Sequence, residues 1–281
     1  MSSQKIKKIL IALWLQTFIF LGVSQGLMRS GLIRDEGLYL LISAICAVLP
    51  LVLWGRGVED YLEEIRRSRW ISLKVILLLF LCCVALNFLG AMLTLPIETL
   101  LKALGWTAKN SNMEDLIVQN TPMFVVYSCI IGPAIEEIIY RGGVQHLLEP
   151  YGAKRAVIFS AILFGFMHHD LYQAIAAAGC GLVFGYAKYH YGLRNAIILH
   201  VLNNIFVTCS ELYRSMAPVI AILALLGIIL LVVLGVRKKL TWEGGLSVDP
   251  PAVSFSYVGV PLGLLLLYEF LFSVITSVHP L

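Results

Sequence analysis

Long runs of apolar residues recur from one end of this 281-residue chain to the other. The hydrocarbon core of a bilayer needs about 20 consecutive apolar residues for each helical span. Four runs have that length and hold no charged side chain: residues 9–28, 37–55, 75–97 and 215–236. Charged residues make up only 14% of the chain, against roughly 25% in soluble domains. The sequence therefore predicts an all-α, polytopic transmembrane helix bundle.

Five further apolar segments raise the expected number of spans to about eight or nine. Three of them are long enough but contain ionisable residues, and two are shorter: residues 122–148, 195–213 and 251–278, then residues 156–169 and 171–187. We expect one integral membrane domain over residues 1–281. Its functional core is expected in residues 122–213, where the polar intramembrane side chains are concentrated.

Basic residues in the polar segments predict the orientation of the bundle. With the N-terminus in the cytoplasm, most Lys and Arg residues fall on the cytoplasmic side, as the positive-inside rule requires. The cytoplasmic segments would then be Lys5–Lys8, Arg56–Lys74, Lys154–Arg155, Lys188–Arg194 and Arg237–Lys239. The outer loop, residues 98–121, holds only Lys102 and Lys109. A net charge of +4, placed beside the membrane, suits contact with lipid and gives nucleic-acid binding no support.

Two short helices are expected outside the spans. The stretch VEDYLEEIRRSRW places Glu63 and Arg67 four residues apart, which suits an interfacial helix. The stretch PIETLLKALG predicts an outer helical turn that begins at Pro96 and ends at Gly105.

The stretch IGPAIEEIIYRGG places Glu136, Glu137 and Arg141 inside one span. An ionisable group in hydrocarbon costs about 2.5–3.5 kcal/mol on insertion scales, so these residues need a reason. Glu137 and Arg141 are four residues apart and can pair on one helix face. Glu136 points about 100° away and has no charge partner on its own helix, which makes it a candidate acid or base. The structural alternative is an ion cluster that only holds helices together.

Two later stretches add polar side chains to neighbouring spans. The stretch FGFMHHD places His168 at the end of a short apolar run, residues 156–168. This run makes only about 20 Å of helix, which is shorter than the bilayer core, so His168 would lie within the membrane. HVLNN places His200 and Asn204 on one helical face, whereas Asn203 points elsewhere and suits a helix–helix contact. An interfacial histidine and simple interhelical hydrogen bonds are the structural alternatives.

Together the three stretches supply the parts of a hydrolytic site. A carboxylate, a histidine and a His/Asn donor pair can act as general base, proton shuttle and oxyanion donors. No Ser or Cys nucleophile accompanies them, so an activated water is the expected attacker. Counted along the chain, Glu136, His168 and His200 fall at different depths, which requires tilted or kinked helices. Gly132 and Pro133 are the expected kink.

These motifs, in this order on successive membrane helices, resemble the CPBP family, the CAAX proteases and bacteriocin-processing enzymes also called the Abi family. The residues that carry the resemblance are EEIIYR (Glu136, Glu137, Arg141), FGFMH (Phe164, His168) and HVLNN (His200, Asn204). The resemblance covers residues 122–213 and implies an intramembrane endopeptidase.

The resemblance also implies a role for each motif residue. Glu136 and His168 would activate the water, and His200 and Asn204 would form the oxyanion hole. The remaining motif residues, Glu137, Arg141 and Phe164, would support the site.

The family is often labelled as metalloproteases, which raises the question of a cofactor. If a zinc ion is present, its ligands would be Glu136, His168 and His200, since three N or O ligands and a water make a catalytic zinc site. The HExxH signature is absent from the sequence. We therefore expect a glutamate mechanism without metal or other cofactor.

Two other functions fit the same residues. A non-catalytic family member would act as a bacteriocin-immunity or regulatory membrane protein. A proton-coupled transporter would use Glu136 as a relay, but no inverted repeat is detectable. For an enzyme, the expected substrate is a membrane-embedded or membrane-associated peptide or protein, and the expected location is a bacterial cell membrane.

Overall fold

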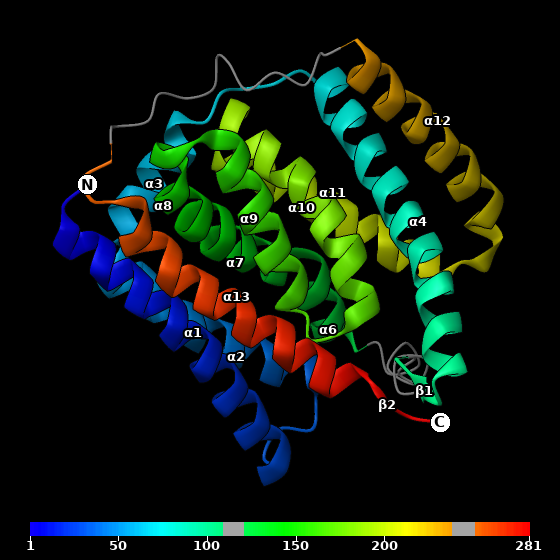
Figure 1. Ribbon diagram of the computed structural model, residues 1–281, viewed down its shortest axis with the longest axis horizontal. Helices are drawn as coiled ribbons and strands as arrows, with labels where there is room; N and C mark the ends of the chain where they lie inside the picture. Colours follow the sequence, from blue (N-terminus) through cyan, green and yellow to red (C-terminus); the bar gives the residue numbers. More distant parts are fainter. Residues whose placement is uncertain (109–120, 238–250) are drawn as a thin grey trace.

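The computed structural model describes residues 1–108, 121–237 and 251–281, which form a bundle of helices (Figure 1). The helices are α1 (Ser3–Ser30), α2 (Glu36–Leu49), α3 (Val58–Arg67), α4 (Leu73–Ala103), α6 (Pro122–Val126), α7 (Gly132–Ile139), α8 (His146–Leu148), α9 (Ala153–Phe166), α10 (Leu171–Tyr191), α11 (Leu193–Leu212), α12 (Ala217–Val236) and α13 (Phe255–Ser277). Three π-helical segments, η1 (Pro50–Gly55), η3 (Tyr127–Ile131) and η4 (Tyr140–Gln145), and two 3₁₀ turns, η5 (Glu149–Tyr151) and η6 (Arg214–Met216), complete them. The predicted all-α, polytopic class is confirmed.

Strand structure in the described residues is limited to one short antiparallel pair. Strand β1 (Trp106–Thr107) follows α4, and strand β2 (His279–Pro280) follows α13. The pair joins the end of α4 to the end of the chain.

Seven helical segments of the described chain are long and apolar enough to cross a membrane. They are Ser3–Ser30, Glu36–Gly55, Leu73–Ala103, Pro122–Tyr151, Leu193–Leu212, Ala217–Val236 and Phe255–Ser277, and they correspond to seven of the nine expected spans. The two shorter expected spans are also helical, as α9 and α10, but neither meets that criterion.

Helices α9 and α10 lie in the middle of the bundle, between α1 and α13 on one side and α4 and α12 on the other (Figure 1). Small residues allow this close packing. A Cβ on Gly165 of α9 would lie 2.5 Å from the Ala174 carbonyl oxygen, and a Cβ on Gly90 of α4 would lie 2.8 Å from Ala176. The low apolar content of α10 therefore reflects contact with other helices.

The helical rod from Pro122 to Tyr151 carries two π-helical segments, one on each side of α7. At the first of them, the Gly132 N–H donates to the carbonyl of Tyr127, five residues earlier. A Cβ at residue 132 would lie 2.9 Å from that oxygen, so glycine permits the wider turn. The irregularity expected at Gly132 and Pro133 is thus a pair of π-helical turns that flank the two glutamates.

The stretch after Pro96 is helical and stops near Gly105 as expected, but the prediction that a separate turn begins at Pro96 is wrong. Helix α4 continues through Pro96 and ends at Ala103, just before Gly105, which has a φ of 81°. The expected interfacial helix is present as α3, and Glu63 pairs with Arg67 as the spacing predicted.

Segments predicted to be cytoplasmic meet at one end of the bundle. Lys5 pairs with Asp60, and Arg194 Nη2 donates to the Ser68 carbonyl at 2.8 Å. Lys188 Nζ lies 2.6 Å from Glu149 and 3.3 Å from Glu64. Three further lysines used in that prediction, Lys109, Lys238 and Lys239, lie outside the described residues.

The Glu64 carboxyl of α3 is part of this charged end. Burial raises its pKa, but the positive charges of Lys188 and Arg56 outweigh burial and lower the pKa to about 2. Glu64 is therefore ionised at neutral pH, and it helps to hold the polar segments together.

Candidate active site

Glu137 and Arg141 form a fully buried ion pair. Arg141 Nη1 lies 3.0 Å from Glu137 Oε1, and both side chains have no exposed surface. Arg141 Nη2 also donates to the Gly181 carbonyl of α10 at 3.0 Å, and its guanidinium lies 4.4 Å above the Phe164 ring. The pairing that the i, i+4 spacing predicted is present, and it reaches two neighbouring helices.

His200 of α11 is held on three sides. Its Nδ1 lies 2.9 Å from Glu137 Oε1. A carboxylate oxygen can only accept, so Nδ1 carries the proton. The ring stacks on Phe184 at 4.4 Å and meets the edge of Phe164 at 5.4 Å. These contacts leave Nε2 directed at Glu136, where the distance to Oε2 is 3.7 Å.

Both glutamates have a buried Oε2 without a hydrogen-bond partner among the described residues, but Oε1 of Glu137 is held by Arg141 and His200. Glu136 differs from Glu137 in being partly exposed. The side chain is 19% exposed, whereas that of Glu137 has no exposed surface. Because only the Glu136 side chain is partly exposed, its unpartnered oxygen is the one of the two that a further group can reach.

His168 lies in the turn that follows α9. Its Nδ1 is 3.0 Å from the Phe164 carbonyl and 3.3 Å from the Gly165 carbonyl. Carbonyl oxygens accept, so Nδ1 is again the protonated nitrogen and Nε2 is left with a lone pair. Glu136 and His200 are within electrostatic reach of this imidazole.

Asn204 of α11 contacts the rod from Pro122 to Tyr151 at Ser128, before the glutamates. Its Nδ2 donates to the Ser128 carbonyl in η3 at 3.0 Å, and its Oδ1 accepts from Asn203 at 3.2 Å. One N–H of the amide therefore remains for another acceptor. Asn203 itself accepts from Asn87 of α4 at 2.8 Å, which is the helix–helix contact that its position predicted.

Phe164 is the contact that brings the three motifs together. Its ring meets His168 at 5.0 Å, His200 at 5.4 Å and the Arg141 guanidinium at 4.4 Å. The depths counted along the chain therefore do not separate the motifs. Helix α9 is short, with 14 residues, and π-helical turns flank the glutamates.

The described side chains do not gather three ligands for a metal ion. Within residues 1–108, 121–237 and 251–281, no group of three or more His, Cys, Asp or Glu side chains is close enough to hold one. Glu136, His168 and His200 therefore do not form a set of three metal ligands in this arrangement.

Sequence reasoning missed several residues around the site. Phe184 and Gly181 contact His200 and Arg141, but an aromatic residue or a glycine in a span carries no signal of its own. A pair between the partly buried His169 and the buried Glu269 lies beside His168. A signal for Glu269 existed, because an acidic residue inside a predicted span is a functional candidate by default.

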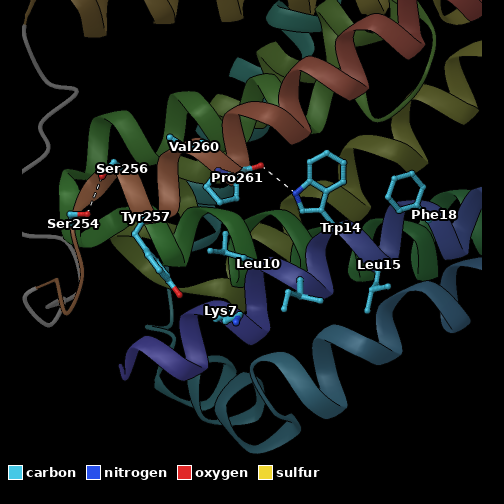
Figure 2. A pocket seen from close by; sticks show the side chains of 11 residues that line it. Lys7, Leu10, Trp14, Leu15, Phe18, Ser254, Ser256, Tyr257, Val260 and Pro261 are labelled. Atoms are coloured by element: carbon cyan, nitrogen blue, oxygen red, sulfur yellow. Dashed lines mark hydrogen bonds between the residues drawn. The ribbon is translucent and has the colours of Figure 1, made fainter.

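A groove of about 740 Å³ lies elsewhere, between α1 and α13. Figure 2 shows Trp14, Phe18, Tyr257 and Pro261 along it and Lys7 near one end. None of the candidate site residues lines this groove, so it is separate from the candidate active site.

Comparison with known proteins supports the same region. Residues 118–206, which contain all three motifs, match the family model described as type II CAAX prenyl endopeptidase Rce1-like. YdiL of Bacillus subtilis (strain 168), named as a membrane peptidase, is 25% identical over 184 residues, or 64% of this chain and 74% of YdiL. The membrane-embedded CAAX protease MroQ of Staphylococcus aureus (strain USA300) is 32% identical over 117 residues, or 38% of this chain and 47% of MroQ.

No solved structure matches the chain. The helical fold, the family match and both relatives define the class as a multi-pass membrane protein related to membrane peptidases. These matches support the resemblance to the CPBP family that the three motifs predicted.

Proposed function

We propose that this protein is an intramembrane endopeptidase that hydrolyses a peptide bond with water activated by Glu136 and His168. One observation carries the proposal. Glu136 Oε2 is buried without a hydrogen-bond partner among the described residues, 3.7 Å from His200 Nε2, and its side chain is 19% exposed, whereas the adjacent Glu137 has no exposed surface and its Oε1 is held by Arg141 and His200. Two neighbouring carboxylates in such different environments suit different roles.

In this mechanism the water lies between Glu136 and His168. His168 Nε2 accepts one hydrogen bond from the water and orients it. Glu136 removes a proton as the water oxygen attacks the carbonyl carbon of the substrate. The protonated Glu136 then gives that proton to the leaving amine as the carbon–nitrogen bond breaks, so the carboxylate is regenerated.

His200 and Asn204 are the proposed donors to the negatively charged oxygen. Because His200 Nδ1–H is committed to Glu137, Nε2 donates only when the ring carries both protons. Asn204 has one N–H left after its bond to Ser128. Losing one such donor costs about 10²–10³ in kcat.

The proposed substrate is a membrane-associated peptide or protein, such as a peptide leader or a membrane protein. A prenylated chain is a less suitable substrate if the source is bacterial, because such a cell would not normally supply one. We place the enzyme in the cell membrane with its N-terminus in the cytoplasm, and we propose that it needs no metal.

A library of internally quenched peptides, presented to the purified full chain in detergent, tests this function. Glu136→Gln should lower cleavage by at least about 10²–10⁴, the usual contribution of a general base. Glu211→Gln is the matched control, because it makes the same chemical change at an exposed site near the end of α11. Glu137→Gln should mainly lower stability, since it leaves Arg141 buried without a charge partner.

Near-normal cleavage by Glu136→Gln would contradict the proposed role of Glu136. If the wild type and Glu136→Gln leave every peptide uncut, the non-catalytic alternative of an immunity or regulatory membrane protein is favoured.

A further inference from the structure

Helix α13 lies outside the region that matches the family model, yet it contacts the turn that carries His168. In Figure 1 it runs beside α1 on one side and α9 on the other. Its Glu269 is only 1% exposed. A buried carboxylate in a membrane span needs partners, and those partners indicate what it does.

Both carboxylate oxygens of Glu269 are engaged. Oε2 lies 2.7 Å from His169 Nε2, in the turn between α9 and α10. Oε1 accepts a hydrogen bond of 2.9 Å from the Thr17 hydroxyl of α1, and that hydroxyl accepts from Gln16 at 2.8 Å. Glu269 therefore connects α1 and α13 to the residue that directly follows His168.

His169 has an unusual backbone. Its φ of 54° makes it the one non-glycine residue with positive φ in the described parts of the chain. Such a conformation is unfavourable for a residue with a Cβ and persists only where the surroundings impose it. The pair with Glu269 is one of the contacts that impose it.

Hydroxyl groups of α13 hold the backbone of the same turn. Ser273 donates to the Phe166 carbonyl at 2.6 Å, and Thr276 donates to the His169 carbonyl at 2.9 Å. Ser277 accepts from the Leu171 N–H at 2.9 Å. Backbone groups at the end of α9 and the start of α10, which lack helical partners there, are thus satisfied by α13.

The position of His168 depends on this turn. Its Nδ1–H bonds to the Phe164 and Gly165 carbonyls, so the direction of Nε2 follows the backbone that connects Phe166 to His169. If residue 169 relaxed to negative φ, the peptide that joins it to His168 would rotate and the imidazole would move with it.

We propose that Glu269 and His169 are positioning residues that fix His168 for water activation, which makes α13 a part of the active site. This inference rests on the proposed function. It differs from simple helix docking because it predicts a loss of turnover that is separate from a loss of stability.

The test compares two substitutions of Glu269 with a matched control. Glu269→Leu removes both hydrogen bonds and should lower kcat about 10–100-fold, as a displacement of about 1 Å does, with KM within about twofold. Glu269→Gln can still accept from Thr17 and donate to His169, so it should restore most of kcat. Trp14→Phe removes another α1–α13 hydrogen bond, from Trp14 Nε1 to the Pro261 carbonyl at 3.3 Å, and should leave kcat unchanged.

A second readout does not need cleavage. The rate at which diethylpyrocarbonate modifies His168, measured by mass spectrometry in the full chain, should change several-fold in Glu269→Leu and stay unchanged in Trp14→Phe. If the wild type cuts no peptide, the proposed function fails, and this rate still decides whether Glu269 positions His168.

Unchanged kcat and an unchanged modification rate in a folded Glu269→Leu protein would overturn the proposal and leave α13 as an anchor. If Glu269→Leu does not fold, Ser277→Ala replaces it, because it removes only the contacts to Leu171 and the His169 carbonyl. It should change kcat and His168 modification in the same direction, and the absence of both changes would again overturn the proposal.

Discussion

Two adjacent glutamates on one helix can take different roles because their side chains differ in partners and in exposure. Glu137 accepts from His200 and pairs with Arg141, so it is held in one orientation. Each glutamate keeps a buried Oε2 without a partner among the described residues, but only the Glu136 side chain is partly exposed. A buried ion pair is costly to break from one side, which suits Glu137 to support and leaves Glu136 available for chemistry.

The donor role of Asn204 and His200 is the next prediction at the scale of single residues. Asn204→Ala should lower kcat about 10²–10³-fold with much less effect on KM. His200→Gln, which keeps a donor, should retain more activity than His200→Ala. The measurement is steady-state cleavage of a quenched peptide by each purified variant.

Asn203→Ala is the matched control for Asn204→Ala, because it removes the contact to Asn87 and should lower the Tm more than kcat. The same experiment includes metal analysis and chelation, which should leave the wild type active. Stoichiometric zinc whose removal abolishes activity, and whose return restores it, would contradict the donor role and make His168 and His200 metal ligands.

The sequence predicted contacts that depend on spacing within one helix. It placed Arg141 beside Glu137 and put His200 and Asn204 on one face. It could not predict contacts between distant helices, such as His169 with Glu269, which are 100 residues apart. Nor could it show that Glu137 fixes the proton of His200 at Nδ1, because that depends on how two helices pack.

At the scale of helices, close packing of α9 and α10 holds Arg141 in place. A Cβ on Gly181 would lie 2.9 Å from Arg141 Nη2 and 3.1 Å from the Ala161 Cα. The second of these contacts is with backbone, which cannot move cheaply. Glycine at residue 181 is therefore required both for the helix contact and for the hydrogen bond from Arg141 to its carbonyl.

Gly181→Ala should destabilise the protein by about 1–3 kcal/mol, the usual cost of overpacking. It should also lower activity, since Arg141 supports Glu137 and through it His200. Gly263→Ala in α13 is the control, because a Cβ there meets nothing within 4 Å. Thermal unfolding in detergent measures the effect, and equal Tm values for the two variants would show that Arg141 tolerates displacement.

Seven of the spans expected from sequence are helices long and apolar enough to cross a membrane. The two others, α9 and α10, are helical but do not meet that criterion. Helix α10 has 21 residues but is rich in alanine, glycine and tyrosine, because it packs against α4, α9 and α11. Composition cannot separate a helix buried among others from one that faces lipid. Pro96 was misread for a related reason: a proline removes one backbone donor, and a long helix continues past it.

For the whole molecule, charged residues distinguish the two ends of the bundle. The structure gathers Lys5, Arg56, Lys188 and Arg194 at one end, through contacts with Asp60, Gly142, Glu149 and Ser68. The opposite end is marked by Glu98, which pairs with Lys102 and accepts from Tyr172, and by the β1–β2 pair. The clustered basic end is the one that the positive-inside rule assigns to the cytoplasm.

Cysteine labelling in a background without the six native cysteines tests this orientation. All six, Cys46, Cys82, Cys83, Cys129, Cys180 and Cys209, lie within helical segments, so their replacement leaves the loops unaltered. Lys154→Cys should react with a membrane-impermeant maleimide only after the cells are opened, and Lys102→Cys should react in intact cells. The two sites control for each other, since they report opposite ends of one bundle. Reaction of Lys154→Cys in intact cells together with protection of Lys102→Cys would reverse the orientation and place the N-terminus outside.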